Sequence, residues 1–223
     1  MDELIQYGPE LFSGFLKNLL LSVLIGFFSL VVGTILAAMR VSPTPVLRAA
    51  GATYVNVLRN TPLTLVLAFC YLGLSDTLGL IFSTEVPLTN SFWLAVLGMS
   101  AYTSAFVCEA LRSGVNTVPM GQAEAARAIG LTFFQSVRLI IFPQAFRAVI
   151  APLGSVLIAM IKNTTVVAAA GYTVDVAAVM RETFDTTGVS IPIFIGIVLA
   201  FLVVVLPIGW YTGWLSKRLA VAR

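Results

Sequence analysis

The sequence predicts an all-α integral membrane protein that crosses the bilayer about five times. Of its 223 residues, 59% are hydrophobic and only 10% are charged, which is far more apolar than a soluble domain. The charged residues leave long uncharged stretches, the clearest being Asn18–Met39, Asn90–Cys108 and Thr187–Ser216. A helix needs a stretch of this kind to cross the hydrocarbon core. We therefore expect one transmembrane domain that comprises residues 1–223.

The order of the spans follows from these stretches and from the residues that break them. They are expected at about 11–39, 51–80, 92–115, 146–171 and 187–216. The prolines of "SPTP" end the first span. Pro62 lies inside the second span, where its missing amide hydrogen and its ring should open the helix. Open backbone at membrane depth is tolerated where it lines a cavity or is buried in protein. The segment "YTVDVAAVMRETFDTTG" before the last span forms either a short surface helix or a simple connector.

The distribution of charge predicts the orientation. Basic residues gather at alternate ends of the spans, namely Arg40, Arg48, Arg112, Arg127, Arg138, Arg147, Lys217, Arg218 and Arg223. The opposite ends carry the acidic residues Asp2, Glu3, Glu10, Asp76, Glu85, Asp175, Glu182 and Asp185, beside Lys17 and Arg181. The positive-inside rule then places the N-terminus outside and the C-terminus in the cytoplasm. The net charge of +3 reflects this asymmetry and does not indicate a nucleic-acid partner.

Several functions are excluded by residues that the chain lacks. There is no histidine, so histidine-based catalysis and haem or zinc ligation through histidine are ruled out. Cys70 and Cys108 lie in apolar stretches and are expected to be buried thiols rather than a disulfide or metal site. No G-x-x-x-x-G-K-[ST] motif is present, so the chain cannot by itself cradle the phosphates of ATP. We expect neither an enzyme nor a bound cofactor, and energy must come from a partner or an ion gradient.

Residues 119–143 are too polar for a span and predict a helical elbow outside the membrane. "PMGQAEAARA" favours a helix with Pro119 in its first turn, and Gly130 fits a C-cap that reverses the chain. "LTFFQSVRLIIFPQ" then predicts an amphipathic helix capped by Thr132 and closed by Pro143. Taken alone, such a segment could be an ordinary surface helix. A rigid elbow of this kind is also a candidate docking surface for another protein.

Four motifs together resemble a known family. "QAEAARAIG", followed by Pro143, is similar to the EAA signature of permease subunits in bacterial ABC importers. "RNTPL" (59–63), "FPQAFR" (142–147) and "IKNTT" (161–165) resemble the polar amino acid permeases within that group. The motifs look closest to those of the actinobacterial glutamate-uptake permeases.

The resemblance implies a type I importer permease fold and a set of partners. The elbow would couple to an ATP-binding cassette ATPase dimer, which holds ATP and magnesium, through Glu124, Ala125, Ala126, Arg127 and Gly130. Small side chains at 125 and 126 would allow close approach, while Arg127 either bonds the partner or follows the positive-inside rule. A second permease subunit, identical or a sister, and an extracytoplasmic solute-binding protein would complete the complex in the bacterial inner membrane.

Polar residues inside the spans predict the substrate pathway. A lysine or arginine at a helix centre costs about 2.5 to 3.5 kcal/mol on insertion scales, so its presence needs a reason. The candidates are Arg59, Asn60 and Thr61 before Pro62, and Lys162, Asn163 and Thr164 in the fourth span. They would offer cations and amides to the carboxylates of an amino acid. Because similar motifs recur in the family for substrates of different charge, Arg59 and Lys162 would bind the α-amino acid group shared by all substrates or hold the helices together, rather than select a glutamate side chain. Asn163, Thr164 and Thr165 could equally form hydrogen bonds between helices. For Glu109 we favour an ion pair with Arg112 or with another helix.

The expected function is therefore the transmembrane subunit of an ATP-driven amino acid importer, with glutamate as the substrate that the resemblance implies. Glutamine, aspartate or another polar amino acid are alternatives. An ion-coupled secondary transporter is a further alternative, although it would be expected to carry midplane carboxylates, and Glu109 is the candidate within the spans.

Overall fold

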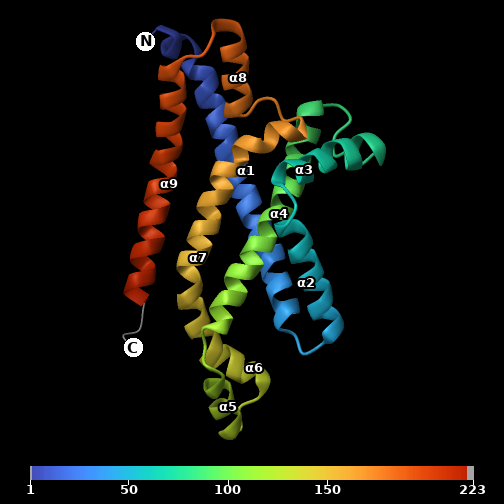
Figure 1. Cartoon of the computed structure of the whole chain (residues 1–223), viewed down its shortest axis with the longest axis vertical. Helices are drawn as coiled ribbons and strands as arrows, with labels where there is room; N and C mark the ends of the chain where they lie inside the picture. The colour runs from blue at the N-terminus through green and yellow to red at the C-terminus, as the bar shows by residue number, and fades with distance from the viewer. Residues whose placement is uncertain (1, 220–223) are drawn as a thin grey trace.

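The computed structural model describes residues 2–219, whose regular structure is helical throughout (Figure 1). Arg223, which contributes to the predicted charge asymmetry, lies outside the described residues. The first half of the chain contains α1 (Asp2–Val41), α2 (Pro45–Arg59), α3 (Leu63–Ala68), η1 (Phe69–Thr77) and α4 (Pro87–Asn116). The second half contains α5 (Met120–Ala128), α6 (Phe133–Ser136), η2 (Val137–Ile141), α7 (Phe142–Asn163), η3 (Thr164–Ala170), α8 (Val176–Thr187) and α9 (Ile191–Leu219).

The predicted number of spans is confirmed when the broken helix is counted as one. Four helices are long and apolar enough to cross a membrane, at Gln6–Val41, Pro87–Asn116, Phe134–Ala168 and Ile191–Leu219. The fifth is a pair, Pro45–Arg59 and Leu63–Thr77, bent by 104° around Pro62. The bend occurs where the sequence predicts it, because a proline cannot continue the hydrogen-bond ladder of α2. The segment before the last span forms the helix α8, which packs alongside α1, so the helical part of the first alternative is confirmed.

The prediction that Pro143 closes a helix is wrong. Helices α6, η2 and α7 follow one another without a break, and Pro143 lies in the first turn of α7. The five residues of η2 form a π-helical turn, whose wider path relieves the clash that a proline ring causes. The side-chain amide of Gln144 donates a hydrogen bond of 3.0 Å to the carbonyl oxygen of Ile140. The second arm of the elbow is therefore the beginning of the fourth span.

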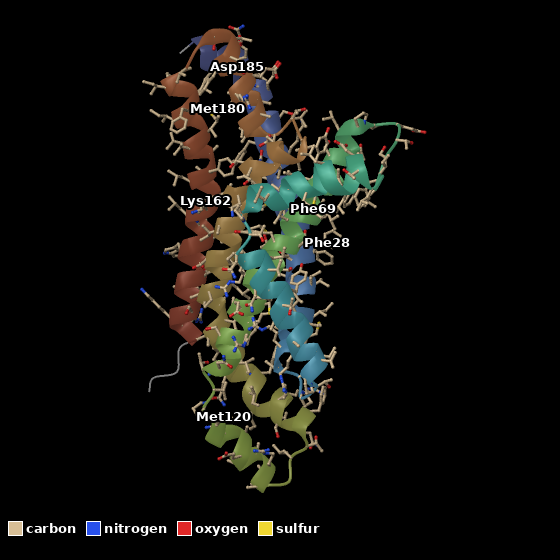
Figure 2. The ribbon with its side chains drawn as sticks, turned by 45° about the vertical axis from the view of Figure 1, so that its right-hand side comes forward. Phe28, Phe69, Met120, Lys162, Met180 and Asp185 are labelled. Carbon is tan, nitrogen blue, oxygen red and sulfur yellow. The ribbon has the colours of Figure 1, made fainter. Side chains whose placement is uncertain are left out.

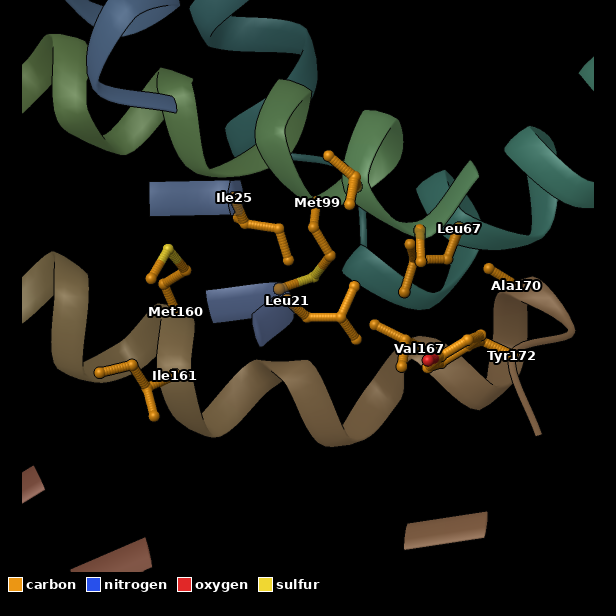
Figure 3. Packing of buried hydrophobic residues seen from close by; sticks show 11 residues of the cluster. Leu21, Ile25, Leu67, Met99, Met160, Ile161, Val167, Ala170 and Tyr172 are labelled. Carbon is orange, nitrogen blue, oxygen red and sulfur yellow. The ribbon is translucent and has the colours of Figure 1, made fainter. Parts of the chain in front are cut away.

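Helix α4 lies at the centre of the bundle and packs against α1, α2 and α7. Glycines let these helices approach closely, as is common between membrane helices. A Cβ atom at Gly33 of α1 would lie 2.5 Å from Cγ1 of Val107, and one at Gly114 would lie 2.8 Å from the carbonyl oxygen of Ala145 in α7. The largest apolar cluster fills the space between α1, α3, α4, α7 and η3 and includes Leu21, Leu67, Met99, Met160 and Val167 (Figure 3).

A buried group of polar residues joins α1, η3 and α8 at the end of the bundle that carries the N-terminus (Figure 1). The side-chain amide of Asn18 donates to Thr164 Oγ1 at 3.1 Å, and its oxygen accepts from the backbone amide of Val176 at 2.9 Å. Asp175 caps α8, since its carboxylate accepts from the amides of Ala177 and Ala178 at 3.2 Å each. Asn18, Thr164 and Asp175 have no exposed surface. These bonds fix α8 against the rest of the bundle.

The buried cap gives a prediction about pH. Burial raises the pKa of the Asp175 carboxyl above its ordinary value, although hydrogen bonds to the carboxylate partly offset the effect. A carboxyl with a raised pKa in the folded state binds its proton more tightly when folded, so the folded state loses stability as pH rises through that pKa. We expect Asp175→Asn, which can still cap α8, to melt at or above the wild-type temperature at neutral pH. The gain should disappear as pH falls toward the ordinary aspartate value, about 4.

Asp175→Ala is the matched control, because it removes the cap and should cost about 1 kcal/mol at neutral pH. Thermal unfolding of the purified protein in detergent, followed by tryptophan fluorescence, measures both variants. Equal destabilisation by asparagine and alanine at neutral pH would show that the charged carboxylate itself stabilises the fold.

Candidate functional site

The elbow forms one end of the molecule, beyond the helices of the bundle (Figure 1). The link between α1 and α2 and the C-terminal end of α9 lie in the same half, whereas the N-terminus and α8 lie at the opposite end. We call these the elbow end and the far end. Arg40 lies in the last turn of α1, Arg48 in the first turn of α2 and Arg127 in α5, so these basic residues belong to the segments of the elbow end.

The turn of the elbow is defined by backbone and side-chain hydrogen bonds. Gly130 has φ 84°, in the left-handed region that favours glycine. Its amide donates to the carbonyl oxygen of Arg127, and the amide of Leu131 donates to that of Ala126, both at 3.0 Å, which is the Schellman pattern. Thr132 and Gln135 then form a reciprocal cap of the next helix, with bonds of 2.9 and 3.3 Å. The predicted turn at Gly130 and the cap at Thr132 are confirmed; Pro119 precedes α5 by one residue instead of lying inside it.

The exposed surface of the elbow differs from the one that the sequence predicts. Glu124, Ala125, Arg127 and Gly130 are exposed. Ala126 is 3% exposed and faces inward, so it cannot be a contact residue as predicted. Its role is to let α5 pack against its own chain.

Sequence reasoning missed three apolar residues on this surface. Met120, Ile129 and Phe134 are 76%, 76% and 71% exposed (Met120 is labelled in Figure 2). Large apolar side chains that flank a rigid turn outside the bundle are typical of a protein-binding site. The sequence could have indicated them, because these apolar residues do not fall on the apolar face of either predicted helix of the elbow.

The break at Pro62 is completed by side chains that bond back to α2. Asn60 Nδ2 donates to the carbonyl oxygen of Asn56 at 2.7 Å, and Thr61 Oγ1 donates to that of Val57 at 2.8 Å. The Asn56 carbonyl also accepts from the backbone amide of Asn60 at 3.3 Å, so side-chain and backbone bonds together complete the last turn of α2. The structure thus gives Asn60 and Thr61 a role in ending α2, while leaving Asn60 exposed and Thr61 half-buried.

Arg59, the last residue of α2, belongs to a cluster of charges around Glu109. Arg40 of α1 contacts Glu109 Oε1, while Nη1 of Arg59 and of Arg112 lie 3.8 and 3.6 Å from Oε2. The guanidinium of Arg59 also lies over the ring of Phe106, 5.7 Å from its centroid. The predicted ion pairing of Glu109 is confirmed, both with Arg112 and with other helices. We call Glu109, Arg40, Arg59 and Arg112 the charge cluster.

A cavity of about 290 Å³ between α4 and α7 lies next to this cluster. Tyr102, Thr103 and Phe106 of α4 line it, opposite Ser155 and Asn163 of α7. Phe106 is shared, since its ring both lines the cavity and contacts the Arg59 guanidinium. Arg59 and Asn163, two predicted pathway residues, are thereby brought to one region.

The other two predicted pathway residues of α7 and η3 lie elsewhere. Lys162, labelled in Figure 2, lines a separate and mostly apolar cavity of about 420 Å³ with Met180 of α8 and Phe194 of α9. Thr164 is fully buried and bonded to Asn18, so the interhelical alternative is correct for this residue and it does not line a pathway here. Successive residues of a helix point about 100° apart, and for this reason "IKNTT" cannot face a single cavity.

The remaining predicted features are structural. Cys70 and Cys108 are buried free thiols, as expected. Among the side chains that the structure describes, which exclude those of residues 1–5 and 220–223, no three histidine, cysteine, aspartate or glutamate residues are placed to hold a metal ion.

Spanning helices with cavities between them, together with a rigid elbow outside them, are the features of a membrane transport permease. The chain belongs to the family of binding-protein-dependent transport system inner membrane components, which matches residues 29–221. It is 45% identical to the glutamate transport system permease protein GluC of Corynebacterium efficiens, over 97% of this chain and 96% of that one. It is 34% identical to the probable glutamine ABC transporter permease protein GlnM of Bacillus subtilis, over 92% and 91%.

A solved structure gives the same fold. A chain of an amino acid ABC transporter crystallised with histidines superposes with a TM-score of 0.84 at 27% identity, over 96% of each chain. The predicted importer-permease fold and inner-membrane location are therefore confirmed.

The charge cluster gives a prediction about stability. Arg40 has a side chain that is only 12% exposed, so its bond with Glu109 is poorly screened by water. A double-mutant cycle with Arg40→Gln and Glu109→Gln should give a coupling energy of about 1 to 3 kcal/mol. Unfolding by sodium dodecyl sulfate in mixed micelles measures it.

The matched comparison is the cycle for Arg112→Gln and Glu109→Gln. This pair is more exposed and lies one turn apart on α4, so we expect about 0.2 to 0.5 kcal/mol. Equal coupling energies in the two cycles would contradict this prediction, because they would mean that Arg40 and Arg112 stabilise Glu109 to the same extent.

Proposed function

We propose that this chain is the transmembrane subunit of an ATP-driven importer that moves an acidic amino acid, glutamate, into the cytoplasm. The observation that carries the coupling part of the proposal is the elbow, a fixed turn with an exposed, partly apolar surface outside the spans. The relatives named as glutamate and glutamine permeases support an amino acid with a polar side chain as the substrate. In this proposal the elbow end faces the cytoplasm, the N-terminus lies outside and the C-terminus inside.

The continuity of the elbow with the fourth span suggests how force reaches the pathway. Helices α6, η2 and α7 form one unbroken rod, so a displacement of the elbow moves α7 directly. α7 carries Asn163 at one cavity and Lys162 at the other. ATP binding would close a pair of ATPase subunits, draw the elbows of two permease chains together and open the helices outward. ATP supplies this bias only because it binds the closed ATPase pair more tightly than the open one.

The partners in this proposal contact opposite ends of the permease. The ATPase dimer binds the elbow surface through Glu124, Ala125, Arg127, Met120 and Ile129, with Gly130 setting the turn. A solute-binding protein docks at the far end, where α8 exposes Arg181 and Asp185. A second permease subunit completes the pathway beside Arg59 and the α4–α7 cavity.

An ion-coupled transporter fits the structure less well. Such a transporter needs a carboxylate that is free to bind and release its ion. Glu109 lies within 4 Å of three arginines and is not free. Glutamine or aspartate as the substrate would leave the rest of the proposal unchanged.

The proposal predicts that the elbow transmits the energy of ATP. Gly130→Pro cannot adopt φ 84° and also loses the amide that bonds Arg127, at a local cost of about 3 kcal/mol. We expect ATP-dependent glutamate uptake to fall at least about tenfold, since each 1.4 kcal/mol corresponds to a factor of ten. The assay is uptake into proteoliposomes that contain the permease, its ATPase and its solute-binding protein.

Gly213→Ala is the control, because a Cβ there meets nothing within 4 Å and Gly213 lies in α9, away from the elbow. Its uptake should equal that of the wild type. Uptake driven by a sodium or proton gradient without the ATPase would overturn the proposed function. So would full ATP-dependent uptake by the Gly130→Pro variant.

A further inference from the structure

The charge cluster contains more positive than negative charge. Glu109 is the carboxylate at its centre, and within the described chain Arg40, Arg59 and Arg112 are the basic groups within 4.0 Å of it. One negative charge thus faces three positive charges from α1, α2 and α4. Like charges held near one another repel, most strongly at the enclosed Arg40, and a second anion would relieve that repulsion.

The three arginines are not engaged equally. Arg40 is the most enclosed and takes one carboxylate oxygen for itself. Arg59 and Arg112 share the other oxygen from 3.8 and 3.6 Å, beyond the usual hydrogen-bond range. Their side chains are 44% and 38% exposed. Each guanidinium has five N–H donors in a fork that matches a carboxylate, so both retain the capacity to bind one.

The position of the two arginines fits an amino acid better than an isolated anion. Arg59 lies against Phe106, whose ring also lines the α4–α7 cavity. The same cavity is lined by Tyr102, Thr103 and Asn163, whose side chains carry hydroxyl and amide groups. A molecule with a carboxylate at the arginines would extend its remaining polar groups toward these partners.

We propose that Arg59 and Arg112 form a carboxylate-binding site for the transported amino acid and that Glu109 is the counterion which the substrate displaces. This inference rests on the proposed function, because it assigns the residues that recognise its substrate. In the empty state Oε2 of Glu109 holds Arg59, which contacts Phe106 at the cavity, together with Arg112. In the loaded state a carboxylate of the substrate replaces Oε2 at these two arginines. Arg112, which the sequence indicated as a partner of Glu109 and as one of the basic residues at the cytoplasmic side, becomes a binding residue.

The test measures amino acid binding to the permease itself. The complex of permease and ATPase is placed in phosphatidylcholine nanodiscs without the solute-binding protein, so that the specificity of that protein does not contribute. Labelled glutamate and labelled glutamine are titrated against the wild type, Arg59→Gln and Arg112→Gln. Each variant should bind glutamate at least about tenfold more weakly, the loss expected when a charge-assisted hydrogen bond is removed. If only glutamate binds more weakly to the variants, the arginines bind its side-chain carboxylate. If glutamate and glutamine lose affinity equally, the arginines bind the α-carboxylate, which both amino acids carry.

Two further variants separate binding from folding. Arg48→Gln is the matched control, because Arg48 bonds only the carbonyl oxygens of Ser42 and Pro43 in the described structure, and its glutamate binding should be unchanged. Glu109→Gln removes the competing carboxylate and should bind glutamate several-fold more tightly, even though it destabilises the protein. A purely structural ion pair predicts the opposite sign, weaker binding together with lower stability. Arg59→Lys keeps the charge and should retain most of the affinity.

The outcomes distinguish the two proposals. If ATP-dependent uptake is observed but Arg59→Gln and Arg112→Gln bind glutamate as Arg48→Gln does, the charge cluster is only structural and the inference is wrong. Absence of glutamate binding to the wild-type complex would overturn it as well. If the wild-type complex shows no ATP-dependent uptake, the proposed function fails, whatever the binding data show.

Discussion

Close packing of α4 against its neighbours is the constraint on which the rest of the structure depends. In a bilayer, apolar side chains gain little by leaving lipid for another helix, so helices are held by tight van der Waals contact and by polar bonds. Gly33 and Gly114 provide that contact on two sides of α4, where no larger residue would fit. The same packing places Glu109 of α4 within reach of arginines from α1 and α2. The position of the charge cluster therefore depends on the close helix packing that these glycines allow.

Polar residues then connect the helices at two levels of the bundle. Asn18 joins α1 to η3 and α8 near the far end, whereas Glu109 joins α1, α2 and α4 nearer the elbow end. The two groups differ in how completely they are satisfied. Asn18 has partners for both its amide nitrogen and its oxygen and is fully buried, as expected of a fixed joint. The charge cluster is partly exposed and has more cations than anions, which suits a place where a charged molecule binds and leaves.

Departures from the α-helix occur where the chain must change direction or absorb a proline. The π-turn of η2 lets Pro143 sit in a continuous rod, and the break at Pro62 turns the chain by 104°. The first keeps the elbow rigidly joined to α7, while the second frees the end of α2 to present Arg59. Two prolines with the same local chemistry thus have opposite consequences, because a widened turn accommodates one and an open break follows the other.

Much of the fold was determined by the sequence alone. The five apolar stretches, the break at Pro62, the turn at Gly130 and the cap at Thr132 depend on local rules of length, dihedral angle and hydrogen bonding, which act over a few residues. The motifs also identified the family. What local rules could not decide is which residues meet across the bundle. Thr164 proved to be buried against Asn18, Lys162 and Asn163 face different cavities, and Ala126 faces inward. Only the tertiary structure decided these points and gathered Arg40, Arg59 and Arg112 around Glu109, because helix rotation and crossing depend on packing between segments far apart in the chain.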